Sequence, residues 1–436
     1  MTRNMQVSVK AAFTAAIVAA VVATVSCSSG PPAPSATSST ATPASPASPT
    51  SPSPTSPSTI SPSTASAALQ PFDAGTLRAD FERTAKEVLV PGAMMLLVTP
   101  EGTLTAAYGT GVRDAQHAIS AEDHIRVGSV TKTWTTTVIL QLVQEGKLSL
   151  DDPVSKHYAD VPNGDAITVE QMLTMRSGLF NYTETLELNS AMDTDPQRAW
   201  KPEELVALAF AHPPYFAPGQ GFHYSNTNTV LLGLIAEKVD GKPLGQLFKE
   251  RIFEPLGLKG TVFPDISSNS VPEPHPQGYF FGDNVLTMTN PALPEDMQKE
   301  AAAGTLAPND VTNVNPSWAW AAGSGISTAA DLKTLGEGLV NGKLLKPELQ
   351  QRRLESVLPT NPDKPDGALY GLGIAKFGNL YGHTGELPGF NTFMGSDPVN
   401  SVTLVVWTNL APAADGRDPA VIIARSLIDQ IYRPAA

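Results

Sequence analysis

Cysteine and basic residues are both scarce in this chain of 436 residues. The single cysteine, Cys27, excludes a disulfide within the chain. Lys and Arg together number 29 against 42 Asp and Glu, so the formal net charge is −13. A surface that binds nucleic acid is normally rich in basic residues, and this charge therefore argues against a nucleic-acid partner.

Several common catalytic patterns are also missing. The chain has no G-x-S-x-G sequence, which argues against an α/β-hydrolase, and no glycine-rich loop of the kind that holds phosphate. It has neither H-E-x-x-H nor a Cys/His cluster, and His212, His223 and His275 stand alone. We therefore expect neither a metal nor another cofactor.

An apolar run, Ala11 to Val25, follows two basic residues at the start of the chain. Its length is typical of a signal peptide and too short to favour a membrane-spanning helix. Cys27 follows at once and resembles the acylated cysteine of a bacterial lipoprotein, although the box Thr24-Val-Ser26 has Thr where Leu is usual. Residues 1–27 are therefore predicted to be a lipoprotein signal peptide that places a lipid-anchored protein outside the cytoplasm. The alternative is ordinary cleavage and secretion, with Cys27 incidental.

Residues 28–70 consist largely of Ser, Pro, Thr and Ala. Such a segment cannot bury a core, so it is predicted to be an extended or disordered linker. Residues 71–436 are predicted to form one hydrolase domain.

The motif Ser129-Val-Thr-Lys132 supplies a nucleophile and a cation. Residues three apart on a helix share a face, so Lys132 lies beside Ser129 if a helix starts there, and Thr133 to Lys147 is predicted to be helical. A lysine acts as a base only if its pKa falls from about 10.4, which burial can achieve. The backbone N–H of Ser129 would supply half of an oxyanion hole. The alternative is a helix cap followed by a surface lysine.

A second motif, Tyr224-Ser-Asn226, adds a phenol and an amide. Tyr224 could act as a general acid or base beside a lysine, and Asn226 could hold a substrate carbonyl or orient Lys132. A turn that caps the following helix would also favour Ser and Asn, and both interpretations can hold together.

A third motif, His383-Thr-Gly385, is predicted to lie on a strand edge. Gly385 would let a ligand approach closely, and the N–H of Glu386 could complete the oxyanion hole. A lone histidine is most often structural, so His383 is a candidate site residue only because the other two motifs accompany it.

The three motifs, in this order, resemble the penicillin-recognising serine hydrolases, which include class C β-lactamases, D-alanyl-D-alanine carboxypeptidases and related esterases. The match is closest to secreted actinomycete carboxypeptidases and covers nearly all of residues 71–436. The resemblance implies that Ser129 is acylated, that Lys132 and Tyr224 move protons, and that Asn226 and Thr384 contact substrate. The family usually has Lys or His at the start of the third motif, and His383 agrees with that pattern. The resemblance also implies that Trp318 forms an aromatic wall of the site.

Two positions depart from that family pattern. Ala375, with Lys376 beside it, stands where an arginine that holds the substrate carboxylate is expected. Glu386 stands where a small hydroxyl residue is usual, and an acid there is expected to repel a C-terminal carboxylate. Both departures affect the substrate and leave the acylation machinery intact.

Apolar patterns at the two ends of the domain predict one shared antiparallel sheet. The predicted elements are a helix over 77–89, strands over 93–98, 104–108, 392–394 and 401–407, and a closing helix over 420–432. We therefore expect an α+β fold, an α-β sandwich with helices flanking the sheet and a helical lobe at about 130–320. This is the β-lactamase/transpeptidase-like fold that the resemblance implies. The segment 263–315 is predicted to form loops around the mouth of the site.

These observations predict an extracytoplasmic serine hydrolase that acts through an acyl-enzyme. The favoured activity is that of a D-alanyl-D-alanine carboxypeptidase on a cell-wall peptide or a β-lactam. The alternatives are an esterase or amidase that uses the same machinery and a non-catalytic lipoprotein that binds cell wall or β-lactam. The expected partners are a small-molecule or peptidoglycan-peptide substrate and a lipid anchor, and the sequence indicates no protein partner.

Overall fold

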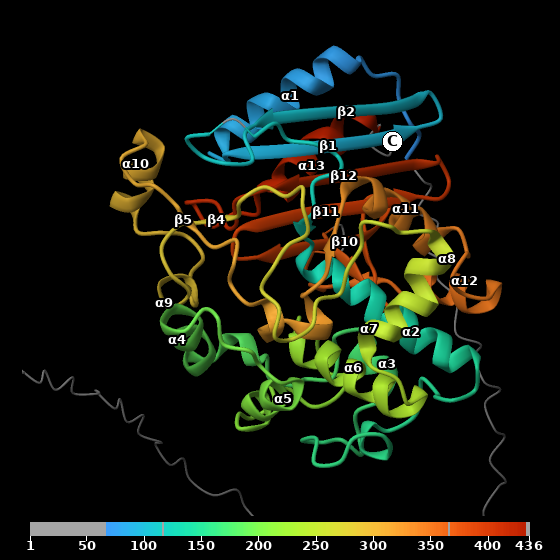
Figure 1. The fold of residues 1–436 in the computed structure, drawn as a ribbon. Helices are drawn as coiled ribbons and strands as arrows, with labels where there is room; N and C mark the ends of the chain where they lie inside the picture. Colours follow the sequence, from blue (N-terminus) through green and yellow to red (C-terminus); the bar gives the residue numbers. More distant parts are fainter. Residues whose placement is uncertain (1–66, 116, 365–366, 433–436) are drawn as a thin grey trace, which may run out of the picture. The chain divides into compact units, whose positions relative to one another are not determined.

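Segments from the two ends of the domain meet in one antiparallel sheet. The computed structural model describes residues 67–115, 117–364 and 367–432. Within them the largest sheet has eight strands in the order β2-β1-β12-β11-β10-β9-β8-β7 (Figure 1). The strands are β1 Gly92–Thr99, β2 Gly102–Gly109, β7 Leu358–Pro359, β8 Leu369–Tyr370, β9 Ala375–Phe377, β10 Leu380–Leu387, β11 Phe390–Asp397 and β12 Val402–Thr408. The predicted pairing of the two ends is confirmed, since β1 is hydrogen-bonded to β12 from Ala93↔Thr408 to Val98↔Thr403.

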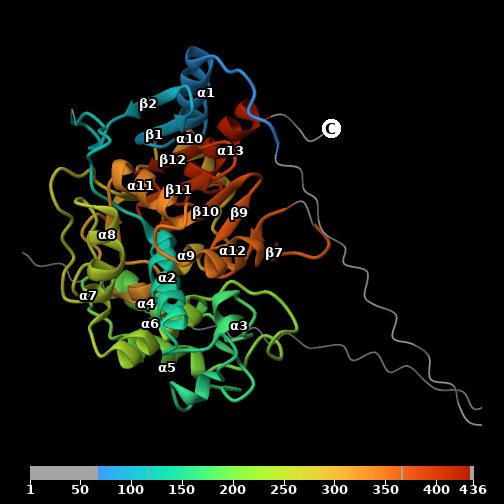
Figure 2. The same cartoon turned by 90° about the vertical axis from the view of Figure 1, so that its right-hand side faces the viewer.

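Helices cover both faces of this sheet. Helices α1 (Ala74–Glu87) and α13 (Pro419–Ile431) lie against one face, and α11 (Ala329–Val340) lies against the other (Figure 2). Because successive side chains of a strand point to opposite faces, Met95 packs in the α1/α13 layer and Met94 in the α11 layer. The strand is therefore buried on both sides, and it reads as a continuous apolar run rather than an alternating one.

The chain between the two halves of the sheet forms a helical lobe, as predicted. Its helices are α2 Thr131–Gln144, α3 Val169–Leu173, α4 Leu186–Thr194, α5 Pro202–Phe210, α6 Asn226–Asp240, α7 Leu244–Phe248 and α8 Glu254–Leu256. Helix α2 packs against α6 on one side and β10 on the other, so nearly all its residues are buried. Its threonines bond to nearby carbonyls, as when Thr135 Oγ1 donates to Ala321 O at 2.7 Å. A helix that is buried all round can thus carry polar residues without leaving them unpaired.

The remaining elements partly depart from the prediction. Segment 263–315, predicted to be loops, also contains α9 (Asn284–Thr287), α10 (Glu295–Ala303) and the strand pair β4 (Tyr279–Phe280) and β5 (Asn309–Asp310). The sequence did not predict α11, α12 (Pro347–Glu355) or the short strands β7 and β8. Two short strands, β3 (Ile125–Arg126) and β6 (Ile326–Ser327), pair directly before the nucleophile motif and before α11.

The folded unit begins before the predicted boundary at residue 71. Leu69 forms a β-bridge with Tyr432, and Gln70 N–H donates to Ile431 O at 3.0 Å. The linker composition does not exclude these contacts, because one apolar residue near a closing helix is enough to make them. The predicted signal peptide, Cys27 and most of the linker lie outside the described residues.

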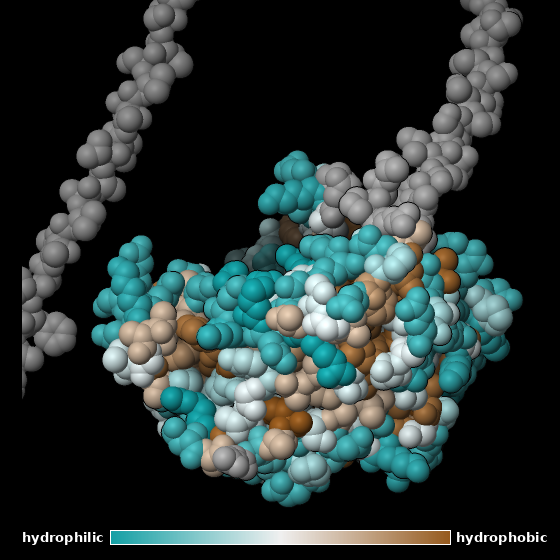
Figure 3. Space-filling view, turned by 90° about the horizontal axis from the view of Figure 1, so that it is seen from above, coloured by the Kyte–Doolittle hydropathy of each residue, from teal (hydrophilic) through white to brown (hydrophobic). Residues whose placement is uncertain are grey.

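None of the helices in the described part of the chain combines the length and apolar character needed to cross a membrane. The face in Figure 3 carries polar side chains interspersed with small apolar patches.

Strand β10 has an unpaired edge beside the turn that carries Ser129. Strand β9 pairs with β10 only over Leu380–Gly382, so the residues that follow face the turn Gly128–Val130 (η1) instead of another strand. A Cβ atom on Gly385 would lie 1.9 Å from Val127 O and 3.2 Å from Ser129 N. Gly385 thus permits the close approach of the chain's own backbone, where the sequence suggested the approach of a ligand.

This contact predicts that Gly385→Ala destabilises the protein. The added methyl group collides with a backbone carbonyl that no side-chain rotation can relieve, so the free energy of unfolding is expected to fall by about 2 kcal/mol or more. Gly245→Ala is the matched control, because its Cβ would meet only the Phe263 ring at 3.4 Å within a helix. Urea unfolding measures both variants, and wild-type stability of Gly385→Ala would contradict the contact.

Candidate active site

Ser129 and Lys132 lie one turn apart where η1 leads into α2. Ser129 is partly exposed, whereas the Lys132 side chain is completely buried. Lys132 Nζ lies 2.9 Å from Ser129 Oγ, 2.7 Å from Asn226 Oδ1 and 2.8 Å from the Ala322 carbonyl oxygen. No carboxylate forms an ion pair with this amine within the described residues. The amine therefore has three hydrogen-bond partners and no counter-charge.

This environment favours the neutral form of Lys132. Burial lowers its pKa well below 10.5, because the charged form has lost its hydration. A neutral amine has two N–H donors and one lone pair. Asn226 Oδ1 and Ala322 O can only accept hydrogen bonds, so the lone pair is left to accept from Ser129 Oγ. The geometry therefore directs the serine proton toward the lysine.

Tyr224 lies beside the same two groups. Lys132 Nζ is 4.9 Å from the centre of the Tyr224 ring, and the phenol is in hydrogen-bond contact with Ser129. Burial raises the pKa of Tyr224 above its usual value of 10, although the contact with Ser129 opposes this shift. The phenol is therefore protonated at neutral pH and is available as a proton donor.

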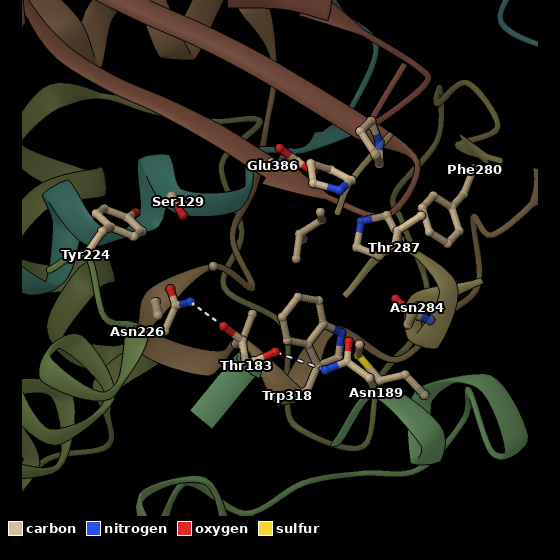
Figure 4. A pocket seen from close by; sticks show the side chains of 18 residues that line it. Ser129, Thr183, Asn189, Tyr224, Asn226, Phe280, Asn284, Thr287, Trp318 and Glu386 are labelled. Atoms are coloured by element: carbon tan, nitrogen blue, oxygen red, sulfur yellow. Dashed lines mark hydrogen bonds between the residues drawn. The ribbon is translucent and has the colours of Figure 1, made fainter. Parts of the chain in front are cut away.

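Asn226 is held in place by the chain that precedes α4. Its backbone N–H donates to Asn181 Oδ1 at 3.0 Å, and its Nδ2 donates to Thr183 Oγ1 at 3.2 Å (Figure 4). These bonds use the Asn226 donors and turn Oδ1 toward Lys132. The sequence analysis missed Asn181 and Thr183.

His383 faces inward, away from the pocket. It is 3 % exposed, its Nδ1 lies 2.5 Å from Thr384 O, and its Nε2 lies 3.1 Å from Tyr370 Oη. The carbonyl can only accept, so Nδ1 carries the proton and Nε2 accepts from the phenol. Burial lowers the pKa of His383 to about 3, so the imidazole is neutral. Its ring centre lies 6.1 Å from that of Tyr224, so His383 lies beside the candidate site but off the pocket wall.

A pocket of about 330 Å³ opens over these groups (Figure 4). One end is polar and holds Ser129, Tyr224 and Asn226, whereas Phe280 and Trp318 lie toward the other end. The full wall comprises Ser129, Thr183, Asn189, Met192, Tyr224, Asn226, Phe280, Asn284, Thr287, Pro291, Trp318, Ala319, Ala322, Gly323, Glu386, Leu387, Pro388 and Pro412. No Lys, Arg or His side chain belongs to this wall, which is formed entirely by described residues.

Glu386 is the only residue on this wall with an acidic or basic side chain. It is exposed to solvent through the pocket, yet protein surrounds it on its other sides. Burial on those sides, a hydrogen bond with the Asp418 carboxyl and the charge of Asp418 together raise the pKa of Glu386 well above 4.5. The acid that the sequence marked as unusual is therefore held against a second carboxyl group.

The structure brings together Ser129, Lys132, Tyr224 and Asn226, and it places Trp318 and Glu386 on the wall of the same pocket. Three other residues predicted to bind substrate lie off that wall: His383, Thr384 and Gly385. Gly385 packs against the η1 turn, and Thr384 is half-buried. Sequence reasoning missed Phe280, Met192 and Asp418, for which no local motif exists.

Comparisons with known proteins agree with this geometry. The sequence matches the family described as Beta-lactamase over residues 77–426. A protein of Escherichia coli K12, provisionally named a D-alanyl-D-alanine carboxypeptidase, is 28 % identical over 70 % of this chain and 76 % of its own length. The D-stereospecific amidohydrolase of a Streptomyces species is 30 % identical and superposes with a TM-score of 0.69, covering 84 % of this chain and all of that one.

A second solved structure, the D-amino acid amidase of Ochrobactrum anthropi, is 25 % identical. It superposes with a TM-score of 0.69 over 82 % of this chain and 97 % of that one. The predicted fold and the predicted resemblance are both confirmed. The chain belongs to the β-lactamase family of serine hydrolases.

Proposed function

We propose that this chain is a serine amidohydrolase that works outside the cytoplasm and forms an acyl-enzyme at Ser129. One observation supports this most strongly: Lys132 is buried without an acid, and its lone pair is directed at the Ser129 hydroxyl. A hydroxyl group needs such a base before it attacks a carbonyl carbon at neutral pH.

In the proposed acylation step Lys132 accepts the Ser129 proton while Oγ attacks the substrate carbonyl carbon. The backbone N–H groups of Ser129 and Glu386 stabilise the negative charge that develops on the carbonyl oxygen. Tyr224 donates its proton to the leaving nitrogen as the amide bond breaks, and the Lys132 ammonium group then restores the phenol. Water attacks the resulting ester by the reverse roles, which releases the acid and restores Ser129.

The absence of a basic side chain from the pocket wall favours an amidase over a D-alanyl-D-alanine carboxypeptidase. A carboxypeptidase substrate has a free carboxylate beside the scissile bond, and such a group needs a cation. Ala375 is buried, and Lys376 places its Nζ 4.9 Å from the Tyr381 ring, away from the pocket wall. The amidohydrolase relatives support the same choice. The carboxypeptidase remains the second candidate because of the similarity to the Escherichia coli protein.

The proposed location follows from the sequence before the described residues. The apolar run before Cys27 would direct export, and acylation of Cys27 would hold the enzyme at the outer face of the membrane. Stable anchoring requires more than one acyl chain, and lipoprotein processing supplies several.

Ser129→Ala is expected to abolish both turnover and covalent labelling. Removing a nucleophile of this kind commonly lowers kcat by about 10⁴-fold or more. Intact-mass analysis after exposure to p-nitrophenyl acetate and to a penicillin detects the adduct, and p-nitroanilide hydrolysis measures turnover. Ser155→Ala, a serine away from the pocket, is the control. An adduct on the Ser129→Ala protein would refute the assignment of the nucleophile.

Cys27→Ala is expected to release the enzyme from the membrane. Without the thiol no lipid can be attached, so the variant should be found in the medium while the wild-type protein stays with the membrane fraction. Fractionation of expressing cells, followed by an activity assay of each fraction, measures this distribution. Equal release of both proteins would contradict the anchor and favour simple secretion.

A further inference from the structure

Glu386 and Asp418 come from separate parts of the fold and meet at the pocket. Glu386 lies on β10, and Asp418 is the residue that precedes the first turn of α13. Their carboxyl groups are in hydrogen-bond contact. Two carboxyl groups in such contact repel each other when both are ionised, which adds to burial in raising the pKa of Glu386, and a cation beside them would relieve that repulsion.

The Asp418 side chain does not cap the helix that it precedes. An aspartate before a helix normally accepts a hydrogen bond from the first turn, yet the Asp418 side chain makes no such bond. Asn391 caps the helix instead, because its Oδ1 accepts a hydrogen bond from Ala420 N–H at 2.9 Å. Asn391 lies opposite Glu386 in the β10–β11 register, and its Nδ2 donates to Gly385 O at 3.1 Å. Capping by Asn391 thus leaves the Asp418 carboxyl available to Glu386.

The pair has no basic partner within the described residues. Neither carboxyl group forms an ion pair with a Lys, Arg or His side chain there. Arg417, next to Asp418, instead pairs with Asp415 at 2.6 Å. An acidic side chain on a pocket wall that carries no basic side chain suits a positively charged ligand group.

The position of Glu386 indicates which part of a substrate it meets. In Figure 4, Tyr224 lies on one side of Ser129, whereas Glu386, Trp318 and Phe280 lie on the other. Tyr224 would protonate the leaving group, so that group lies on the tyrosine side. The acyl part of the substrate then extends past Glu386 toward the end that holds Trp318 and Phe280. The repulsion of a C-terminal carboxylate that the sequence suggested would instead require Glu386 to lie on the leaving-group side.

We propose that Glu386, supported by Asp418, binds the free α-ammonium group of the residue whose carbonyl is attacked, so that the enzyme takes amino-acid amides and amino-terminal residues of peptides. This assignment rests on the proposed acyl-enzyme mechanism. The α-ammonium group is one carbon from the scissile carbonyl, and the backbone of Glu386 would contribute to the oxyanion hole. One residue would thus contact the carbonyl oxygen through its N–H and the ammonium group through its carboxylate. The substrate side chain would lie against Trp318 and Phe280.

Two substrates that differ only in this charge test the proposal. They are D-phenylalanine p-nitroanilide, which has a free amine, and its N-acetyl derivative, which has none. The wild-type enzyme is expected to favour the free amine by about tenfold or more in kcat/KM. Glu386→Gln should bring the ratio of kcat/KM for the free amine to kcat/KM for the N-acetyl substrate close to one, because the larger loss falls on the free amine.

Two further variants complete the experiment. Asp418→Asn leaves Glu386 in place and should reduce the preference for the free amine in the same direction. Asp415→Asn removes a nearby carboxylate that lies off the pocket wall, and it should change neither rate. An unchanged ratio of the two kcat/KM values in Glu386→Gln or Asp418→Asn would overturn the proposal, and so would a wild-type preference for the N-acetyl substrate.

Labelling of Ser129 by p-nitrophenyl acetate separates this proposal from the mechanism on which it rests. If Ser129 is acylated and the ratio of kcat/KM for the two substrates is the same in the variants as in the wild type, only the role of Glu386 fails. If Ser129 is not acylated in the wild-type protein, the acyl-enzyme mechanism fails, and the ammonium assignment fails with it.

Discussion

The burial of one lysine without a counter-charge is the constraint on which the candidate site depends. A charged amine in this environment would lose its hydration and gain no carboxylate, so the folded protein favours the neutral amine. Asn226 and the Ala322 carbonyl occupy its two N–H groups. The remaining lone pair can only be satisfied by the Ser129 hydroxyl. Folding therefore selects both the protonation state of Lys132 and its orientation.

The fold holds this arrangement by joining three separate parts of the chain. The η1 turn carries Ser129 and leads into α2, which carries Lys132; α6 begins with Asn226, and β10 closes on the η1 turn through Gly385. None of these parts buries the lysine alone. Because α2 packs between β10 and α6, any separation of these elements would rehydrate the amine and restore its charge.

Local motifs were sufficient to predict the main strands and to identify residues that the structure brings together at the candidate site. Ser129 and Lys132 follow from helical spacing, and the strands at both ends follow from short apolar runs. The orientation of His383 and the contact between Glu386 and Asp418 could not be predicted, because they depend on how β10 packs against residues distant in sequence. The Met192 and Phe280 contributions to the pocket wall could not be predicted either, since these residues come from different segments and neither lies in a motif.

The most direct test of the neutral-lysine account is the pH dependence of Ser129 acylation by p-nitrophenyl acetate, followed by stopped flow and corrected for spontaneous hydrolysis. A base works when it is deprotonated, so the acylation rate should rise with pH through the pKa of Lys132 and then level off. The account predicts that the plateau is reached well below pH 10.5, the ordinary lysine value, and that Lys132→Ala lacks this rise. A rate in the wild-type enzyme that continues to increase through pH 10.5 would show an ordinary, charged lysine and would contradict the account.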